Sequence, residues 1–479
     1  MINNDDFYFN GFDTEKCTDC GLCFEECSVL NLDNITAKED IISLINNDYK
    51  NSLAFKYCTT CNSCNITCPY DADPYELILE NFYIAGQKNG IPSLAKLVFP
   101  NKEGNIWSLT KHLMPEDEVK LLEEWKENVY KKQDEIILTG FYSNIMPYVA
   151  KTGLYGDLHD KIVGYEGLFG CGGDSYKLGQ LKMTYQIGKR VQKFFKDIGV
   201  KKVYTFMEAE TAMLKEVLPE RFGIEFDFEV KPVDSLLYDR IKSGEIVITN
   251  KLNKKVTLHD NCCSRYLNSV PQKESREILE QLGCETVEMK HTKKDALCCG
   301  WAATIPTLYR EKYSLIETFL YLLESLNIRL KEAEETGAEI LVTTCHACTI
   351  FLAMIKELKN SKIEIYTIQE MIQLGVGEIP LHRHSDRAWD ILAISLNLAY
   401  KYFTNSQFRE NFIPEDVELE LSEMPDASEE DINRVKSIRK LLTGKFVQNS
   451  VTGKILASTI DGITNHYLKK IDKDKRRKK

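Results

Sequence analysis

Apolar and polar positions alternate in two different ways along the central part of the chain. Between residues 136 and 380, short runs rich in β-branched residues alternate with longer stretches whose apolar residues recur at helical spacing. The short runs predict strands at 135–139, 202–206, 255–259, 339–343 and 362–366. The longer stretches predict helices at about 176–198, 208–218, 265–283, 305–335 and 346–359. Alternating strands and helices predict parallel sheets that carry helices on both faces.

The segments on either side of this body are predicted to be helical. Residues 36–57 carry an apolar stripe at helical spacing, and residues 74–85 predict another helix. A connector helix is expected from Pro115 to about Lys131, and residues 389–403 predict a strongly apolar helix. We therefore expect an α+β multidomain chain, divided into residues 1–90, 91–135, 136–250, 251–380 and 381–479.

Composition and charge restrict the location and the partners. The chain has 479 residues and a formal net charge of −11, which gives no global support for nucleic-acid binding. Its start is acidic where a signal peptide would be basic, and no stretch approaches the ~20 apolar residues that span a bilayer. We therefore expect a cytoplasmic protein, peripheral to a membrane at most through a partner. In that compartment the 16 cysteines stay reduced, which favours metal binding over disulfides.

The first cysteines form two runs with the same spacing, C-x2-C-x2-C-x3-C. The runs consist of Cys17, Cys20, Cys23 and Cys27, and of Cys58, Cys61, Cys64 and Cys68. This is the spacing of bacterial two-cluster ferredoxins, in which the fourth cysteine of each run reaches the other cube. We therefore assign two cubane [4Fe–4S] clusters, one to Cys17, Cys20, Cys23 and Cys68 and the other to Cys58, Cys61, Cys64 and Cys27. Zinc sites are the alternative, although zinc prefers pairs separated by a longer loop.

A second set of cysteines is spread over the later part of the body. It consists of Cys262, the adjacent pair Cys298-Cys299, and Cys345-x-x-Cys348. The adjacent pair requires an irregular turn, which the following Gly300 permits. We interpret these cysteines as ligands of a further iron–sulfur cluster, with a structural zinc site or a vicinal disulfide as the alternative. Cys263 is either a substitute ligand or a buried thiol, and Cys284 is expected to be a small core residue.

The body also contains an internal repeat. Met207 and Glu210 align with Cys345 and Cys348, and Gly170-Cys171 aligns with Cys298-Cys299. The preceding strand places Phe141 or Tyr142 opposite Cys262. Because the first copy keeps only Cys171, we predict that it holds no cluster and survives as scaffold. The glycine-rich segment 164–179 is either a tight turn or an opening for a ligand, and Cys171 is either a buried thiol or a redox residue.

The cysteine pattern resembles the CCG domain of heterodisulfide reductase B and D subunits. It also resembles anaerobic glycerol-3-phosphate dehydrogenase C subunits and lactate-oxidation iron–sulfur proteins, although the gap between Cys299 and Cys345 is longer than in heterodisulfide reductases. A two-cluster ferredoxin followed by two CCG modules is similar to the D-subunit layout, over roughly residues 10–380.

This resemblance implies an α-helical two-[4Fe–4S] ferredoxin domain, two α/β (Rossmann-like) CCG modules and a helical C-terminal region. It also implies a non-cubane [4Fe–4S] cluster, with the terminal chemistry, at Cys262, Cys298, Cys299, Cys345 and Cys348.

The C-terminal region shows no ligand pattern. His382 and His384 lack a third metal-binding partner, so we expect them at the surface. Residues 414–431 predict an exposed acidic loop, residues 451–471 an amphipathic docking helix, and residues 470–479 a solvated basic end.

Together these features predict an iron–sulfur oxidoreductase subunit of anaerobic metabolism. The preferred hypothesis is electron transfer between the clusters, in a hetero-oligomer with a flavoprotein or other redox partner. A catalytic heterodisulfide reductase subunit acting on a disulfide or thiol is the second hypothesis. A metal-stabilised interaction scaffold is the third.

Overall fold

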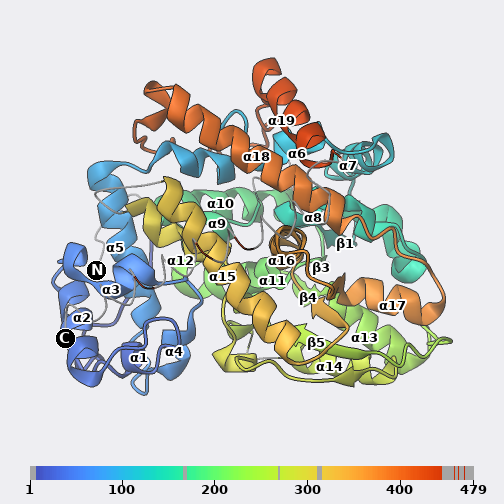
Figure 1. Cartoon of the computed structure of the whole chain (residues 1–479), viewed down its shortest axis with the longest axis horizontal. Helices are drawn as coiled ribbons and strands as arrows, with labels where there is room; N and C mark the ends of the chain where they lie inside the picture. The colour runs from blue at the N-terminus through green and yellow to red at the C-terminus, as the bar shows by residue number, and fades with distance from the viewer. Residues whose placement is uncertain are drawn as a thin grey trace.

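The computed structural model describes residues 7–164, 170–267, 270–309 and 315–444, together with positions 458, 462 and 469. Figure 1 shows the N-terminal helices at one end of the molecule and the C-terminal helices α18 and α19 along one side. The acidic start, the basic end, and the Val451, Ile455, Ile463, Tyr467 and Ile471 stripe of the predicted last helix lie outside the described residues.

The N-terminal region is helical, with two short helices in the cysteine runs. Its helices are α1 (Leu22–Glu25), α2 (Asn34–Ile45), the 3-10 turn η1 (Tyr49–Asn51), α3 (Leu53–Tyr57), α4 (Ser63–Thr67) and α5 (Pro74–Asn89). The single helix predicted at 36–57 is wrong, because the chain turns between α2 and α3. The buried Asp40 carboxylate stabilises this turn by accepting hydrogen bonds from the Ser52 hydroxyl (3.1 Å) and the Ala54 N–H (2.8 Å).

The connector packs as η2 (Ser93–Val98), α6 (Ile106–Lys111) and α7 (Glu116–Asn128). The helix predicted from Pro115 is confirmed, with Pro115 at its N-cap position. The indole ring of Trp107 in α6 stacks on Phe141 of the following module, with ring centroids 4.1 Å apart. The connector is therefore tied to the body through its aromatic residues.

Two four-stranded parallel sheets follow, and they have the same topology. The first has the order β2-β1-β3-β4, formed by β1 (Glu135–Leu138), β2 (Ile162–Val163), β3 (Lys202–Thr205) and β4 (Glu229–Pro232). The second has the order β6-β5-β7-β8, formed by β5 (Lys255–His259), β6 (Glu285–Thr286), β7 (Ile340–Thr343) and β8 (Glu364–Thr367). All five predicted strands are present, and the short or edge strands β2, β4 and β6 were missed.

Helices cover these sheets in the alternating pattern. Those of the first module are α8 (Phe141–Ile145), η3 (Pro147–Ala150), η4 (Gly153–Lys161), α9 (Gly173–Lys177), α10 (Leu181–Ile198), α11 (Glu208–Ala212), η6 (Met213–Val217), α12 (Leu218–Phe222) and α13 (Val233–Ser243). Those of the second are η7 (Cys262–Arg265), α14 (Val270–Gln281), η8 (Lys293–Asp295), η9 (Ala302–Tyr309), α15 (Leu315–Glu335), α16 (His346–Lys359) and α17 (Ile368–Val376). The helix predicted at 176–198 is divided at Gly179, whose φ is 65°.

The two modules contact each other at the ends of their central strands. Asn261 of the second module donates a hydrogen bond to Glu208 of the first (2.7 Å). His346 of the second module forms a hydrogen bond with Ser143 of the first (2.9 Å). The carboxyl ends of parallel strands carry the functional loops of such sheets, so the two sets of loops lie against one another.

The C-terminal region consists of α18 (His384–Thr404), η10 (Gln407–Arg409) and α19 (Glu429–Leu442). Helix α18 packs on α16 and α6. This packing buries His384 against Tyr148 and Glu370 (2.7 Å each), so its predicted surface position is wrong. Residues 414–428 contain no helix or strand, and their acidic side chains form ion pairs with lysines of the connector and the first module. None of the helices that the structure describes is long and apolar enough to cross a bilayer.

Candidate metal centres

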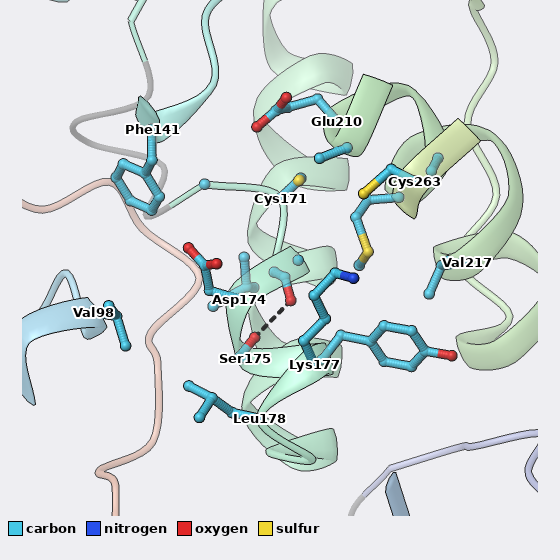
Figure 2. Close-up of a pocket in the computed structure, with 18 of the residues that line it drawn as sticks. Val98, Phe141, Cys171, Asp174, Ser175, Lys177, Leu178, Glu210, Val217 and Cys263 are labelled. Carbon is cyan, nitrogen blue, oxygen red and sulfur yellow. Dashed lines mark hydrogen bonds between the residues drawn. The ribbon is translucent and has the colours of Figure 1, made fainter. Parts of the chain in front are cut away.

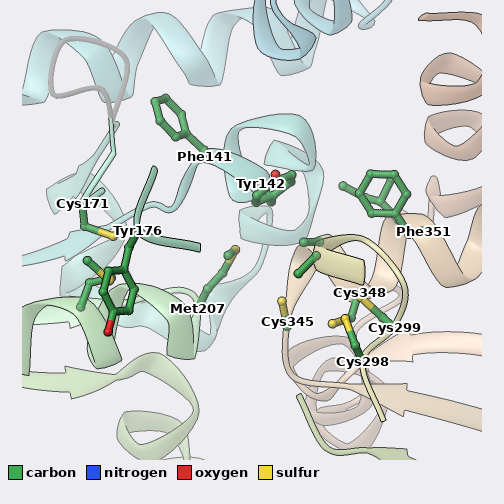
Figure 3. Close-up of a cluster of buried hydrophobic side chains, with 14 of the residues drawn as sticks. Phe141, Tyr142, Cys171, Tyr176, Met207, Cys298, Cys299, Cys345, Cys348 and Phe351 are labelled. Carbon is green, nitrogen blue, oxygen red and sulfur yellow. The ribbon is translucent and has the colours of Figure 1, made fainter. Parts of the chain in front are cut away.

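The second-module cysteines come together from three segments. Cys262 follows β5, Cys298 and Cys299 lie in the loop before η9, and the third segment spans the start of α16. Their side chains contact one another in series, in the order Cys263, Cys262, Cys298, Cys299, Cys348 and Cys345. Figure 3 shows the sulfurs of Cys298, Cys299, Cys345 and Cys348 gathered at one place. The structure thus brings together all five residues that the sequence singled out, with Cys263 beside them.

The local sequence explains how these loops are held. The Asn261 side chain accepts hydrogen bonds from the N–H groups of Cys263 (2.8 Å) and Ser264 (3.2 Å), which caps η7. Gly300 has a φ of 111°, as the adjacent cysteines require, and its N–H donates to Cys298 Sγ (3.3 Å). A Cβ at Gly300 would lie 3.0 Å from Leu326. The turn therefore needs glycine both for its conformation and for its close packing.

Buried cationic and imidazole groups surround these thiols. The pKa of Lys177 would be lowered by burial, but the neighbouring Cys262 and Cys263 side chains raise it well above its usual value. Arg329 donates to His259 Nδ1 (3.3 Å), which leaves the ring proton on Nε2. This Nε2 is buried, has no hydrogen-bond partner among the described residues, and belongs to a group with Cys299 and Cys348 whose ligand atoms lie within 4.8 Å of one another.

This environment fits an anionic iron–sulfur cluster. Thiolates supply the ligands, and hydrogen bonds to sulfur tune such clusters. His259 Nε2 would then donate to a ligand sulfur. The sequence did not single out His259, Lys177 or Arg329. Only His259 carries a local signal, since it precedes Cys262 by three positions on the same strand end.

Two of the N-terminal cysteines, Cys23 and Cys64, are buried, and other cysteines of the two runs lie around each of them. Burial, followed by Cys68, Cys20 and Cys17, raises the pKa of the Cys23 thiol. These four residues line one small pocket. Burial, followed by Cys58, Cys23, Cys61 and Cys27, raises the pKa of Cys64. Each group therefore gathers around one buried cysteine, which fits two neighbouring cubes.

The second of these groups is linked to the second-module thiols by hydrogen bonds. The Thr60 N–H donates to Cys58 Sγ (3.2 Å), and Lys177 Nζ donates to the Thr60 carbonyl (2.9 Å). The same Nζ donates to Cys262 Sγ (3.5 Å). Arg265 forms a second link, since it donates to the Cys61 carbonyl (3.0 Å) and to the Lys294 carbonyl in the loop before Cys298 (3.0 Å).

The first module has the same frame with different residues at the ligand positions. Leu138 pairs with Thr205 as His259 pairs with Thr343, so Phe141 is the residue opposite Cys262. Cys171 is buried and lies apart from the second-module sulfurs, with Met207 and Tyr142 between them in Figure 3. Phe141, Gly170, Met207 and Glu210 supply no thiolate, so these side chains do not fit a cluster.

The comparisons with known proteins agree with these motifs. The chain matches the cysteine-rich domain family CCG over residues 256–353 and the 4Fe-4S dicluster domain over residues 13–72. It is 21% identical to "Probable iron-sulfur-binding oxidoreductase FadF" of Bacillus subtilis over 345 residues, which is 67% of this chain and 46% of that protein.

Two further relatives are named for redox reactions. The chain is 22% identical to "EtfAB:quinone oxidoreductase" of Syntrophomonas wolfei over 309 residues, 62% of this chain and 42% of the relative. It is 29% identical to the D subunit of the dihydromethanophenazine:CoB–CoM heterodisulfide reductase of Methanosarcina barkeri over 163 residues, 33% of this chain and 37% of the relative. The chain spans less than half the length of each of these relatives. The chain therefore carries a 4Fe-4S dicluster domain and a cysteine-rich CCG domain, and over part of its length it is similar to a heterodisulfide reductase D subunit.

Proposed function

We propose that the chain is an oxidoreductase subunit that passes electrons between two ferredoxin-type [4Fe–4S] clusters and one CCG-domain cluster. The observation that carries this proposal is the hydrogen-bonded connection from Cys58 through Thr60 and Lys177 to Cys262. It joins a predicted cube ligand to a predicted CCG ligand across two parts of the chain. We therefore assign the cube of Cys58, Cys61, Cys64 and Cys27 as the neighbour of the CCG cluster.

The chain's own residues would hold and shield these groups. The clusters would supply one-electron storage at potentials set by ligands, hydrogen bonds and burial. Cys17, Cys20, Cys23 and Cys68 would hold the outer cube, and Cys262, Cys298, Cys299, Cys345 and Cys348 the CCG cluster in its non-cubane form. Lys177, Arg265 and His259 would donate hydrogen bonds around the connection and offset thiolate charge.

The partner we propose is a flavoprotein or another redox subunit, which would meet the outer cube. Cys17 and Cys20 are partly exposed. Three apolar side chains near these runs are also exposed, namely Ile35 (71%), Ile66 (49%) and Tyr70 (47%). Two relatives carry names of redox complexes, and a third is named "Probable membrane-anchored ferredoxin". We propose a cytoplasmic location, with any membrane attachment supplied by the partner.

A catalytic disulfide reductase is the second proposal. Cys263, beside Cys262, faces a cavity that a substrate could enter. However, heterodisulfide reductases use two CCG clusters that face one substrate, and the first module lacks the thiols for one of them. Electron transfer to a partner therefore remains our preferred function.

The decisive test is iron and sulfide quantification with EPR spectroscopy on anaerobically purified protein. Three clusters at four iron atoms each predict about 12 iron atoms per chain. About 16 would contradict the empty first module, and about 8 would contradict the CCG cluster. An absence of reducible signals in iron-loaded protein would contradict electron transfer and favour the scaffold hypothesis.

A further inference from the structure

Two of the loops that carry cysteines of the second module also contact the first module. Asn261 directly precedes Cys262, and Thr344 directly precedes Cys345. The side-chain amide of Asn261 donates to the Thr344 hydroxyl (2.9 Å), which joins the two loops. The same amide donates to the carboxyl group of Glu208 in α11 (2.7 Å). A side chain of the first module therefore lies where two cysteine loops of the second module meet.

The Asn261 side chain uses both of its ends in these contacts. Its oxygen accepts hydrogen bonds from the N–H groups of Cys263 (2.8 Å) and Ser264 (3.2 Å). Its nitrogen is therefore the end that reaches Thr344 and Glu208. Asn261, Thr344 and Glu208 are all buried, so losing one of them would leave polar atoms without a partner and without solvent to replace it.

The Glu208 carboxyl group accepts hydrogen bonds from both loops. Burial raises the pKa of Glu208 to about 8, and the hydrogen bonds from Asn261 and Thr344 oppose this increase. A hydrogen bond that lowers the pKa of a carboxyl group favours its charged, accepting form, so both side chains act as donors. A neutral carboxyl group keeps an oxygen that can accept, so these contacts do not require Glu208 to be ionised.

The reciprocal contact between the modules is different. His346 occupies the position of Glu208 in the repeat, one residue after Cys345. It contacts the Ser143 hydroxyl in α8 (2.9 Å), and α8 carries no cysteine. The contacts are therefore asymmetric, because the module that lacks the five cysteines supports loops of the module that has them.

Glu210 offers a comparison within the same helix. It is also a buried glutamate of α11 whose pKa burial raises to about 8. Its Oε2 atom has no hydrogen-bond partner among the described residues. The side chain lines the cavity of the first module together with Cys171 (Figure 2). A buried position on α11 is thus not sufficient for the contacts that Glu208 makes.

We propose that Glu208 is a positioning residue of the CCG cluster, which holds the loops of Cys262 and Cys345 at a fixed separation. This role rests on the proposed function, because it requires a cluster at these cysteines. The first module, without a cluster of its own, thereby completes the site of the second. Without Glu208, Asn261 and Thr344 lose the partner they share, so the loops are held less tightly and bound iron is released more readily.

Iron release tests this role on the full-length, iron-loaded protein under anaerobic conditions. The dithionite-reduced protein is mixed with an excess of ferrozine, which binds Fe(II), and EPR spectra identify the cluster that is lost. Glu208→Leu should release about four iron atoms at least about tenfold faster than the unmodified chain, because two buried hydrogen bonds are lost. The EPR signal of the CCG cluster should change before this loss, and the ferredoxin signals should not change.

Two further variants of α11 separate positioning from a general loss of stability. Glu208→Gln keeps an oxygen that accepts both hydrogen bonds, so it should release iron as slowly as the unmodified chain. Glu210→Leu replaces the neighbouring buried glutamate and should also leave the release rate unchanged. Equal release from Glu208→Leu and Glu210→Leu would overturn the proposal, and so would fast release from Glu208→Gln.

Thr344→Val tests the link to the loop of Cys345. It removes the hydroxyl group with little change in shape and should accelerate release less than Glu208→Leu does. Both substitutions remove the contact between Thr344 and Glu208, so the double variant should release iron more slowly than the product of the two single effects predicts. Single effects that simply multiply would overturn the link.

The iron content of the unmodified chain separates this role from the proposed function. About 12 iron atoms per chain, with unchanged release from Glu208→Leu, would overturn the role of Glu208 and leave the proposed function intact. About 8 iron atoms in the unmodified chain would contradict the CCG cluster and therefore both proposals.

Discussion

The two modules of the body have the same sheet topology and differ in the side chains that lie at the carboxyl ends of the central strands. Both sheets have the same strand order, and both bond the last threonine of the third strand to a threonine in the next helix, through Thr205 with Thr211 and Thr343 with Thr349. The second module gathers thiols, and the first has a cavity lined by aromatic, thioether and carboxyl groups. The same sheet topology thus carries a group of thiols in one copy and different side chains at the equivalent positions in the other.

The surroundings of the two sites differ in charge as well. In the second module, buried charges are paired, as Asp260 is with Arg276 (2.9 Å on both carboxylate oxygens). In the first, Glu210 is buried with an unpartnered oxygen. The Asp260–Arg276 ion pair restrains the loops that carry the cysteines of the second module. The unpartnered Glu210 oxygen of the first module is available to form a hydrogen bond with a bound ligand.

The largest effect on stability is expected when Asp260 of the second module is replaced by threonine, the residue at the equivalent position of the first module. Thr139 occupies the position of Asp260, whose carboxylate also accepts the Lys293 N–H (2.7 Å) in the loop before Cys298. Asp260→Thr leaves Arg276 paired with Glu288 alone and should lower the free energy of unfolding by about 3 kcal/mol. Asp197→Thr, which breaks a surface pair with Lys193, should have a much smaller effect on stability. Urea denaturation measures both, and equal losses would contradict the role of Asp260.

A second prediction concerns the connection between the sites. Lys177→Met removes a positive charge 3.5 Å from Cys262 Sγ, which should lower the reduction potential of the CCG cluster by on the order of 100 mV. Lys182→Met, in which the lost lysine pairs with Asp416 at the surface, should leave the potential unchanged. EPR-monitored redox titration measures both. An unchanged potential in Lys177→Met would contradict the claim that Lys177 of the first module influences the CCG cluster.

A third prediction concerns the turn of the first module at Gly170, the position that aligns with Cys298 of the second module. Gly170 has a φ of 77°, and an added Cβ would lie 2.7 Å from the Phe141 ring. Gly170→Ala should therefore cost about 2 kcal/mol or more, whereas Gly199→Ala, with a φ of 71° and open space around it, should cost about 1 kcal/mol. If thermal unfolding shows equal losses, the Phe141 ring does not restrict this position.

The smallest effect is a pH dependence in the first module. Because burial raises the pKa of Glu210 to about 8, the folded chain keeps a proton that the unfolded chain releases above its ordinary value of 4.5. The contribution of this group to stability is thus complete below pH 4.5 and decreases as the pH rises towards 8. Between pH 6 and 7, the unmodified chain should lose about 1 kcal/mol of unfolding free energy because of Glu210, and the Glu210→Gln variant should not show this loss. A pH profile identical to that of the unmodified chain would show that Glu210 is ionised in the folded state.

The sequence predicts those parts of the fold and site that are encoded locally. Ligand spacing within a loop identified the N-terminal cysteines, the order of three separate motifs identified those of the second module, and β-branched runs identified the central strands. The edge strands β2 and β6 are too short to show a pattern, and the turn between α2 and α3 depends on Asp40 reaching across to Ser52. Lys177 and Arg329 lie far in the sequence from the cysteines they contact or surround, so no spacing relates them to the site. His384 is buried because α18 packs on the body, which the polar sequence around it does not indicate.

The most direct test of the account compares equivalent cysteines in the two modules. Cys299 and Cys171 occupy the same place in the repeat, and both are buried. We predict that Cys299→Ser loses about four iron atoms and the EPR signal of the CCG cluster, while the ferredoxin signals persist. Cys171→Ser should keep about 12 iron atoms and all signals. Loss of iron from Cys171→Ser, or full iron retention by Cys299→Ser, would contradict the assignment of one occupied and one vacated module.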